Sequence, residues 1–231
     1  MDDNLRVVIA AAGKGSRMGS STNKQYMLLN GRPVLSYSLD FFEKLPVVHE
    51  IVVVCARDEV EYCEDQIVKR FKFNKVAAVV AGGQERQDSV WAGLQQLGKD
   101  TDLVAVHDGA RPLLSAEVLT RLLAEAREWG AAIPGIPSKD TVKLGDRDGF
   151  VRQTLDRNSV YAIQTPQVFN YNELVTAYRE AQEEQFLGTD DASLFERYIG
   201  RVKIVPGDYN NIKITTPEDM IVAGALLRGK D

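Results

Sequence analysis

A glycine loop that carries its own positive charges follows the first apolar run of the chain. Leu5–Ala11 leads directly into Ala12-Gly13-Lys14-Gly15-Ser16-Arg17-Met18-Gly19, and Lys24 comes five residues later. Glycines let backbone N–H groups approach phosphate oxygens closely, and ligands of open α/β sheets bind beyond the carboxyl ends of the strands. A dinucleotide's diphosphate is usually held by backbone and helix dipole alone. The added cations Lys14, Arg17 and Lys24 therefore suggest a more highly charged ligand, such as a nucleoside triphosphate with a metal ion.

Two better-known glycine motifs do not fit this loop. The dinucleotide fingerprint Gly-x-Gly-x-x-Gly fails because Met18 stands where the third glycine belongs, and Gly19 comes one position late. The P-loop pattern, Gly-x-x-x-x-Gly-Lys followed by Ser or Thr, does not occur. Taken alone, the loop also fits a surface turn with solvated charges, so other segments must decide between these interpretations.

Several motifs, in order along nearly the whole chain, carry a resemblance to one family. Ala11-Ala12-Gly13-x-Gly15-x-Arg17-Met18 followed by Lys24-Gln25-Tyr26 resembles the nucleotidyltransferases that join a nucleoside monophosphate to a sugar or polyol phosphate. Later motifs narrow the resemblance to the 2-C-methyl-D-erythritol 4-phosphate cytidylyltransferases: AGGQERQDSV at 81–90, HDGARP at 107–112, QTPQ at 164–167, TDDA at 189–192 and NIKIT at 211–215. Each motif alone is weak evidence, but their shared order is strong evidence.

The resemblance implies cytidylyl transfer in non-mevalonate isoprenoid precursor synthesis. A phosphate oxygen of 2-C-methyl-D-erythritol 4-phosphate attacks the α-phosphorus of CTP, CMP is transferred and pyrophosphate leaves. The second pKa of a phosphomonoester is about 6, so the nucleophile is mostly dianionic at neutral pH and needs little activation. The main obstacle is repulsion between two polyanions, which positioning and positive charge relieve. This fits a sequence without an obvious Ser–His or Cys–His nucleophile pair.

By the same resemblance, the glycine loop and the segment around Gly82 bind CTP. Arg17 and Lys24 would stabilise the transition state at the α-phosphate, and Lys14 would help the loop's backbone hold the β- and γ-phosphates. Many family members carry an acidic residue where Gln84 stands, so the role of Gln84 stays open. If the family resemblance is set aside, the segment around Gly82 can also be interpreted as a turn that caps the following helix. The other residues expected to bind CTP are Ala11, Ala12, Gly13, Gly15, Gly82, Gly83 and Ser89.

The motif that begins His107-Asp108 ends a predicted strand at the ligand edge of the sheet. We expect Asp108 to be an exposed carboxylate that binds Mg²⁺ or another divalent cation, because Mg²⁺ in nucleotide sites takes one or two carboxylates plus phosphate oxygens. Gly109 would let the ribose come close. We expect His107 to be a buried, hydrogen-bonded histidine, and Arg111 to pair structurally with a carboxylate or a backbone carbonyl.

The acceptor phosphate needs cations of its own. By resemblance, Arg157 and Lys213 match the positions that hold the attacking phosphate, and an arginine suits its bidentate recognition. Without the family, both would be interpreted as solvated surface charges. The positions that match contacts to the polyol phosphate are Thr141, Thr165 and Thr189.

The elements that must position these residues alternate along the chain. Short runs rich in Val, Ile and Ala are typical of strands covered on both faces, and amphipathic stretches separate them. This pattern predicts an open, doubly wound, mostly parallel α/β sheet, a Rossmann-like nucleotidyltransferase fold. The expected strands are Leu5–Ala11, Glu50–Cys55, Val76–Ala81, Leu103–His107, Ala131–Ile136 and Arg201–Val205. The expected helices are Pro33–Lys44, Asp58–Phe71, Asp88–Leu97, Ser115–Trp129, Tyr171–Glu184, Asp190–Gly200 and Pro217–Leu226.

The alternation breaks after Ile136. Short β-prone pieces and the turn signal Asp146-Arg147-Asp148-Gly149 predict a β-hairpin arm, at about 139–168, inserted into a single domain that spans 1–231. A lone hairpin is rarely stable, so we expect the arm to pack against a second subunit and make a homodimer. Arg157 would then serve its own site or the neighbouring subunit's. The pieces are Thr141–Leu144, Phe150–Leu155 and Val160–Thr165.

Composition excludes several other classes. The 231 residues carry 28 Lys and Arg against 33 Asp and Glu, a net charge of −5, which argues against a general nucleic-acid binder. No apolar run reaches the roughly 18 residues of a membrane span, and the acidic N-terminus does not look like a secretory signal. Two cysteines cannot build a disulfide framework or a zinc site. A reducing cytoplasm is the expected setting.

Two alternatives stay open at this stage, and a third fails. A ribitol-5-phosphate cytidylyltransferase shares several motifs, although such sequences tend to have Ser-Val where Gly109-Ala110 stands and differ around Arg157. A non-catalytic CTP-binding module would bind nucleotide without turnover, but it would not need acceptor-phosphate residues such as Lys213. An NAD-dependent dehydrogenase conflicts with the misplaced third glycine.

Overall fold

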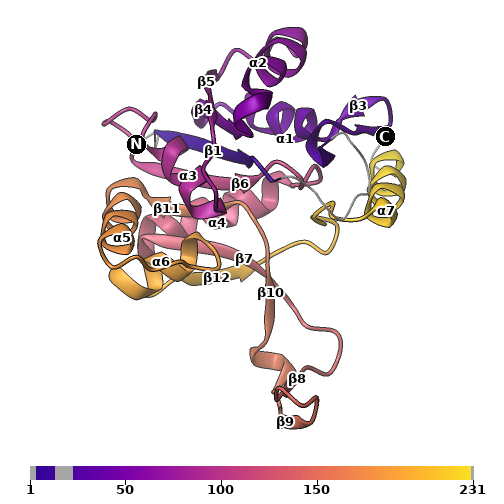
Figure 1. Ribbon diagram of the computed structural model, residues 1–231, viewed down its shortest axis with the longest axis vertical. Coiled ribbons are helices and arrows are strands. Elements are labelled where there is room, and N and C mark those ends of the chain that lie inside the picture. The colour runs from indigo at the N-terminus through magenta and orange to yellow at the C-terminus, as the bar shows by residue number, and fades with distance from the viewer. Residues whose placement is uncertain (1–3, 14–22, 230–231) are drawn as a thin grey trace.

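A single mixed sheet forms the centre of the computed structural model, which describes residues 4–13 and 23–229 (Figure 1). In this part of the chain the sheet has eight strands in the order β10-β7-β11-β6-β1-β4-β5, and β12 pairs with β7. The strands are β1 (Leu5–Ala11), β4 (Val48–Cys55), β5 (Val76–Ala81), β6 (Leu103–Asp108), β7 (Ala131–Pro137), β10 (Tyr161–Ile163), β11 (Gln167–Asn170) and β12 (Lys203–Pro206).

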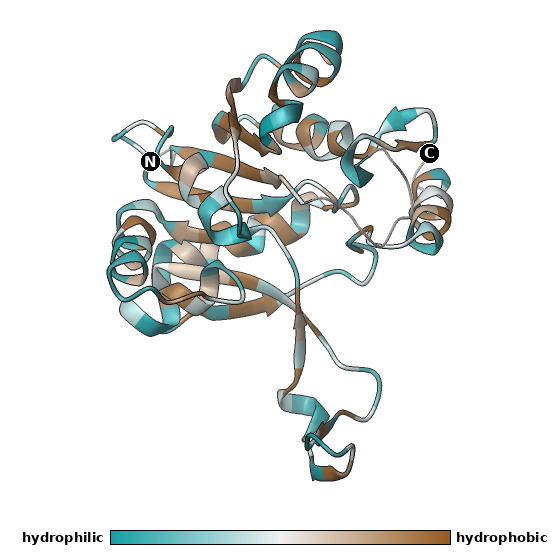
Figure 2. Cartoon of the chain, viewed as in Figure 1, coloured by the Kyte–Doolittle hydropathy of each residue, from teal (hydrophilic) through white to brown (hydrophobic). Residues whose placement is uncertain are grey.

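The strand β1 lies at the middle of the sheet and is parallel to both neighbours, β4 and β6. Successive side chains of a strand point to opposite faces. Val7 and Ile9 therefore join a core cluster on one face, and Val8 joins the cluster on the other. Because both faces are covered, the central strands are almost continuously apolar, as Figure 2 shows by colour.

Helices cover both faces of the sheet. The first core cluster contains residues of α1 (Val34–Glu43), α2 (Val60–Cys63) and α4 (Ala116–Trp129). The second contains residues of α3 (Arg86–Leu94), α5 (Tyr171–Glu183) and α6 (Asp191–Tyr198). The last helix, α7 (Pro217–Arg228), packs in a smaller cluster beside the two-residue strands β2 (Leu28–Leu29) and β3 (Arg32–Pro33). The predicted doubly wound α/β fold is confirmed.

Two predicted elements differ in detail. The helix expected over 58–71 is a succession of short segments: 3-10 turns at Arg57–Glu59, α2, and a π-helix at Glu64–Lys69. The helix expected from Asp88 begins at Arg86, and Asp88 is its third residue, where it completes a capping box with Glu85. The helix expected over Ser115–Trp129 is α4, with Ser115 as its N-cap. Among the described residues, no helix is long and apolar enough to cross a membrane.

The arm ends earlier in the chain than the sequence predicted. The arm was expected to run to 168, but β11 is a strand inside the main sheet, antiparallel to both β6 and β7. β10 also pairs with β7 rather than within the arm. The arm's own hairpin is β8 (Lys143–Gly145) with β9 (Val151–Thr154), which projects away from the rest of the chain in Figure 1. It closes over a turn in which Asp146 accepts hydrogen bonds from the N–H groups of Asp148 and Phe150.

Candidate active site

A pocket of about 170 Å³ lies at the carboxyl ends of β1 and β6, beside the turn that leads from β5 into α3. Open α/β sheets bind ligands at this edge. Residues far apart in the sequence line it: Ala10, Ala11, Ala12, Gly13, Lys24, Gln25, Gly83, Gln84, Glu85, Arg86, Ser89, Asp108, Ala110 and Lys213. Two predicted cations, Lys24 and Lys213, therefore share one pocket with the start of the glycine loop.

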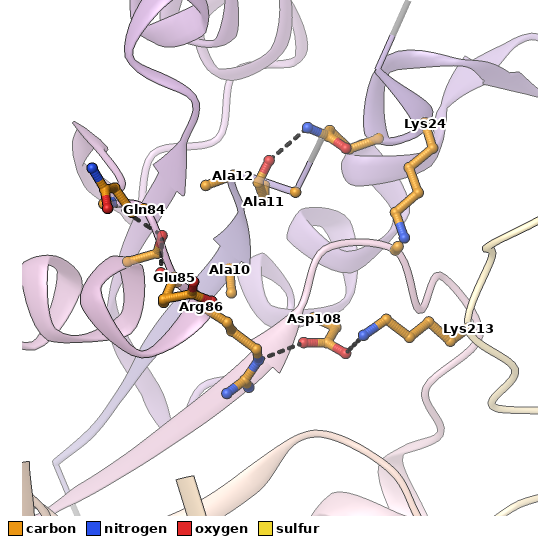
Figure 3. Close-up of a pocket in the computed structure, with 14 residues that line it drawn as sticks. Ala10, Ala11, Ala12, Lys24, Gln84, Glu85, Arg86, Asp108 and Lys213 are labelled. Atoms are coloured by element: carbon orange, nitrogen blue, oxygen red, sulfur yellow. Dashed lines mark hydrogen bonds and ion pairs between the residues drawn. The ribbon is translucent and has the colours of Figure 1, made fainter. Parts of the chain in front are cut away.

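The short 3-10 helix Lys24–Tyr26 places Lys24. Gln25, next in the chain, is buried, and its side-chain amide donates to the backbone oxygen of Ala11 at 2.6 Å. This hydrogen bond ties the helix to the end of β1. Figure 3 shows the Lys24 side chain extending into the pocket toward the region of Asp108 and Lys213.

Asp108 was expected to be an exposed carboxylate, and this is wrong: it is only 7% exposed. Cations surround it instead, with Lys213 Nζ at 2.6 Å from Oδ2, Arg86 Nε at 3.4 Å from Oδ1 and Arg111 Nε at 3.9 Å from Oδ2. Burial by itself raises the pKa of a carboxyl group. Here the charges of Arg86, Lys213 and Arg111 outweigh burial and hold the pKa of Asp108 well below its usual range, so the group stays ionised.

Arg86 is a pocket residue that the sequence interpretation did not single out. Its Nη2 lies 2.8 Å from Oδ2 of Asp191, which is fully buried at the start of α6. Both residues stand in motifs noticed in the sequence, Arg86 within 81–90 and Asp191 within 189–192. A single sequence gives no sign that these two motifs pair across the fold.

The turn before α3 is closely packed. A side-chain carbon at Gly82 would lie 2.5 Å from Ser89 Oγ and 2.7 Å from Cβ of Ala12, so any larger residue would have to displace these neighbours. Ser89 Oγ accepts a hydrogen bond from Gly83 N–H and donates one to the backbone oxygen of Glu85. The segment around Gly82, which was predicted to bind CTP, is thus brought against the end of β1, although Gly82 itself is not among the described lining residues.

Three predicted residues around the end of β6 have structural contacts. A side-chain carbon at Gly109 would lie 2.9 Å from Leu35 Cδ1 and 3.3 Å from Cβ of Ala11, a pocket residue, so the backbone is closely packed there. That Gly109 lets the ribose come close stays a prediction. The hydroxyl of Thr165 accepts from the backbone N–H of Asp108 and contacts His107 Nδ1. His107 is fully buried, as expected, and burial lowers its pKa to about 4.

Arg111 is structural, as expected. Its guanidinium donates to the backbone oxygen of Asn211 at 2.8 Å and thereby fixes the segment that carries Lys213 to the end of β6. Its own backbone oxygen accepts from His107 Nε2.

Three further predicted residues do not line the pocket. Arg157 lies on the arm, and Thr141 and Thr189 are exposed in segments before the hairpin and before α6. Lys14, Gly15 and Arg17 lie outside the described residues.

The fold and the site together define a nucleotidyltransferase: strand ends, glycine backbone and cations gather where an α/β sheet binds nucleotides. Comparisons with known proteins identify the kind. Residues 5–229 match the family model of 2-C-methyl-D-erythritol 4-phosphate cytidylyltransferase, and the chain belongs to this family.

Relatives and solved structures agree with the family model. Two curated cytidylyltransferases of this name, from Caldanaerobacter subterraneus and Pelotomaculum thermopropionicum, are each 48% identical and align over 97% and 99% of this chain and 99% and 96% of their own. The crystal structure of 4-diphosphocytidyl-2C-methyl-D-erythritol synthase from Anaerococcus prevotii is 36% identical, with a TM-score of 0.86 over 98% of this chain and 97% of that one. The Thermus thermophilus enzyme has 30% identity and a TM-score of 0.79 over 97% and 99%.

Proposed function

We propose that this cytidylyltransferase transfers CMP from CTP to the phosphate of 2-C-methyl-D-erythritol 4-phosphate, giving 4-diphosphocytidyl-2-C-methyl-D-erythritol and pyrophosphate. The observation that carries the proposal is the convergence of Lys24, Lys213 and Arg86 on one pocket at the end of β1. Two negatively charged reactants can meet there because the surrounding cations reduce their repulsion.

Each side chain has a role that follows from its charge and place. Lys24, beside the end of β1, stabilises the negative charge that accumulates at the α-phosphate during attack, together with Arg17 of the glycine loop. Lys213, beside Asp108 at the end of the neighbouring strand β6, holds the attacking phosphate. The backbone of Ala11, Ala12 and Gly13 and the turn that follows β5 hold the nucleotide, with Lys14 and Gly15 on the β- and γ-phosphates. Thr141, Thr165 and Thr189 stay proposed contacts of the polyol side.

A divalent cation, Mg²⁺, completes the proposal. Among the described residues no group of three or more His, Cys, Asp and Glu side chains could hold a metal by itself. Asp108, an ionised carboxylate that lines the pocket, fits the usual Mg²⁺ arrangement of one or two carboxylates plus substrate phosphate oxygens. Bound there, Mg²⁺ would neutralise charge on the triphosphate.

The arm also suggests how the chain assembles. We propose that the chain is one domain whose arm packs against a second copy, and that Arg157 reaches the neighbouring subunit's acceptor phosphate. Arg157 does not line its own chain's pocket, and the arm's hairpin projects away from the main sheet (Figure 1). Both cysteines, Cys55 and Cys63, are buried free thiols, which suits the reducing cytoplasm that we propose as the setting.

The deciding experiment follows pyrophosphate release with CTP and Mg²⁺ in two parallel reactions. One contains 2-C-methyl-D-erythritol 4-phosphate and the other ribitol 5-phosphate. We expect release only with the first acceptor. Turnover only with ribitol 5-phosphate would make the chain a ribitol-5-phosphate cytidylyltransferase. CTP binding without release from either acceptor would make it a non-catalytic nucleotide-binding module.

A further inference from the structure

The carboxylate of Asp108 is shared between two side chains that approach it from opposite sides. Its Oδ2 lies 2.6 Å from Lys213 Nζ, and its Oδ1 lies 3.4 Å from Arg86 Nε (Figure 3). Arg111 also faces Oδ2, at 3.9 Å. Charge on Lys213 that Asp108 neutralises is not available to an acceptor phosphate. The balance between these contacts therefore sets how strongly Lys213 can bind its ligand.

Arg86 is held in place from behind. Its Nη2 lies 2.8 Å from Oδ2 of Asp191, which is fully buried. The other oxygen of Asp191 accepts a hydrogen bond from the hydroxyl of Tyr178, also buried, at 2.6 Å. The Tyr178 ring in turn stacks on Trp91 of α3, the helix that Arg86 begins, with 5.7 Å between ring centroids. A guanidinium fixed by a buried carboxylate cannot simply follow Asp108 toward Lys213.

We propose that Arg86 is a positioning residue for the acceptor phosphate: anchored by Asp191, it competes with Lys213 for the Asp108 carboxylate and so makes the Lys213 ammonium more available to the attacking phosphate. This inference rests on the proposed function. Without Arg86, Asp108 would pair with Lys213 more completely, and the acceptor would compete with an intramolecular anion. The nucleotide, bound by the backbone at the end of β1 and by Lys24, would be affected less.

Three variants test the role, each assayed by pyrophosphate release with CTP and 2-C-methyl-D-erythritol 4-phosphate. Arg86→Gln removes the cation. In Arg86→Gln alone, the buried carboxylate of Asp191 would lose its partner. The double variant Arg86→Gln with Asp191→Asn removes that charge as well, so it can be assayed even if the single variant fails to fold. Arg197→Gln is the matched control. It removes an exposed arginine that lies on α6, as Asp191 does, and that pairs with Glu184.

We expect the KM for the acceptor to rise about tenfold in the Arg86 variants, the size expected for losing one hydrogen bond to a charged group. The KM for CTP should change less than about twofold, and Arg197→Gln should match the unaltered protein. If Arg86 acts through Lys213, then Arg86→Gln added to Lys213→Ala should raise the acceptor KM no further, because the two effects are coupled.

Two results would overturn the inference. One is an acceptor KM that stays unchanged in both Arg86 variants. The other is a rise of equal size in the presence and absence of Lys213, which would mean that Arg86 acts independently of that lysine. These outcomes differ from failure of the proposed function, in which the unaltered protein itself would release no pyrophosphate from CTP and the acceptor.

Discussion

At the scale of single residues, positive charge is concentrated around one buried carboxylate. Asp108 lies among Arg86, Arg111 and Lys213, while Lys24 lines the same pocket from the end of β1. Even with Asp191 held against Arg86 and with Glu85 in the pocket lining, these four cations outnumber the three carboxylates. The pocket therefore keeps an excess of positive charge, which is the property that a reaction between two phosphate groups requires.

We predict that Lys24→Ala lowers turnover far more than it weakens CTP binding. The ammonium group matters most when charge accumulates at the α-phosphate, whereas the backbone and other cations also bind the ground-state nucleotide. Loss of one such contact typically costs on the order of a hundredfold in rate. The measurement is kcat from pyrophosphate release, beside the CTP dissociation constant from calorimetry.

The control for this variant is Lys44→Ala, which removes an exposed lysine paired with Asp40 at the end of α1. It should leave both quantities unchanged. Near-normal turnover in Lys24→Ala, or a loss of CTP affinity as large as the loss of rate, would contradict the assigned role. Arg17→Ala is expected to behave as Lys24→Ala does.

Residue types and motif order predicted part of this site. The rest could not be predicted, because it depends on which side chains are buried against one another. The pairing of Lys24 and Lys213 in one pocket followed from their motifs, and so did a buried His107. The contacts of Asp108 did not, because its exposure depends on which cations pack over it. Arg86 was missed because its buried partner, Asp191, lies 105 positions away.

At the scale of elements, the turn from β5 to α3 depends on a glycine without room for a side chain. We predict that Gly82→Ala weakens CTP binding by about tenfold or more, because a methyl group there would overlap Ser89 and Ala12 and push the turn away from the end of β1. Calorimetric titration with CTP measures the effect.

Gly200→Ala provides the matched control for that substitution. Nothing lies within 4 Å of the position that its new carbon would take. CTP affinity should therefore stay at the level of the unaltered protein. Equal affinities in the Gly82→Ala and Gly200→Ala variants would show that the β5–α3 turn does not shape the nucleotide pocket.

The cap of α7 gives a pH-dependent prediction. The carboxylate of Asp219 accepts hydrogen bonds from the N–H and hydroxyl groups of Thr215 and from the N–H of Thr216. Burial raises the pKa of Asp219, but these donors outweigh burial and lower the pKa below 3.8. Because the unfolded chain then binds the proton more readily, this stabilisation is present above about pH 4 and is lost as pH falls through the folded-state pKa.

Asp219→Asn removes this titration. We expect its free energy of unfolding at pH 7 to be lower by about 1 kcal/mol, because a half-buried charged hydrogen-bond acceptor becomes neutral. As pH falls below about 4, the variant should lose less stability than the unaltered protein does. Urea unfolding at several pH values measures both effects, and parallel curves for the two proteins would contradict the assignment.

The elements themselves were largely predictable because buried parallel strands are continuous apolar runs between helices. The strand β11 was not, for a reason of context. Gln167–Asn170 has only two apolar residues, and its place between β6 and β7 is set by pairing with both. Local sequence thus predicted a β-prone segment but could not tell the arm from the sheet.

At the scale of the whole molecule, the arm is the part that its own chain does not cover. Its hairpin carries exposed apolar side chains, among them Leu144, Phe150 at 72% exposure and Val151. A two-stranded hairpin is at best marginally stable in water without further packing. A second copy that covers these side chains would stabilise the arm. In the homodimer proposed above, Arg157 would reach the neighbouring subunit's pocket, because it does not line the pocket of its own chain.

Shared sites can be tested by mixing two inactive proteins, Arg157→Ala and Lys24→Ala, refolded together at equal amounts so that subunits exchange. If Arg157 serves the neighbouring pocket, a mixed dimer has one site with both residues intact and one with neither. Each half of a two-fold dimer makes the same contact with the other, so a mixed dimer has one intact site of two. Half of the dimers are mixed, and we therefore expect about a quarter of the unaltered activity. If Arg157 serves its own subunit, every site lacks one residue, and the mixture should be no more active than the average of its two parents.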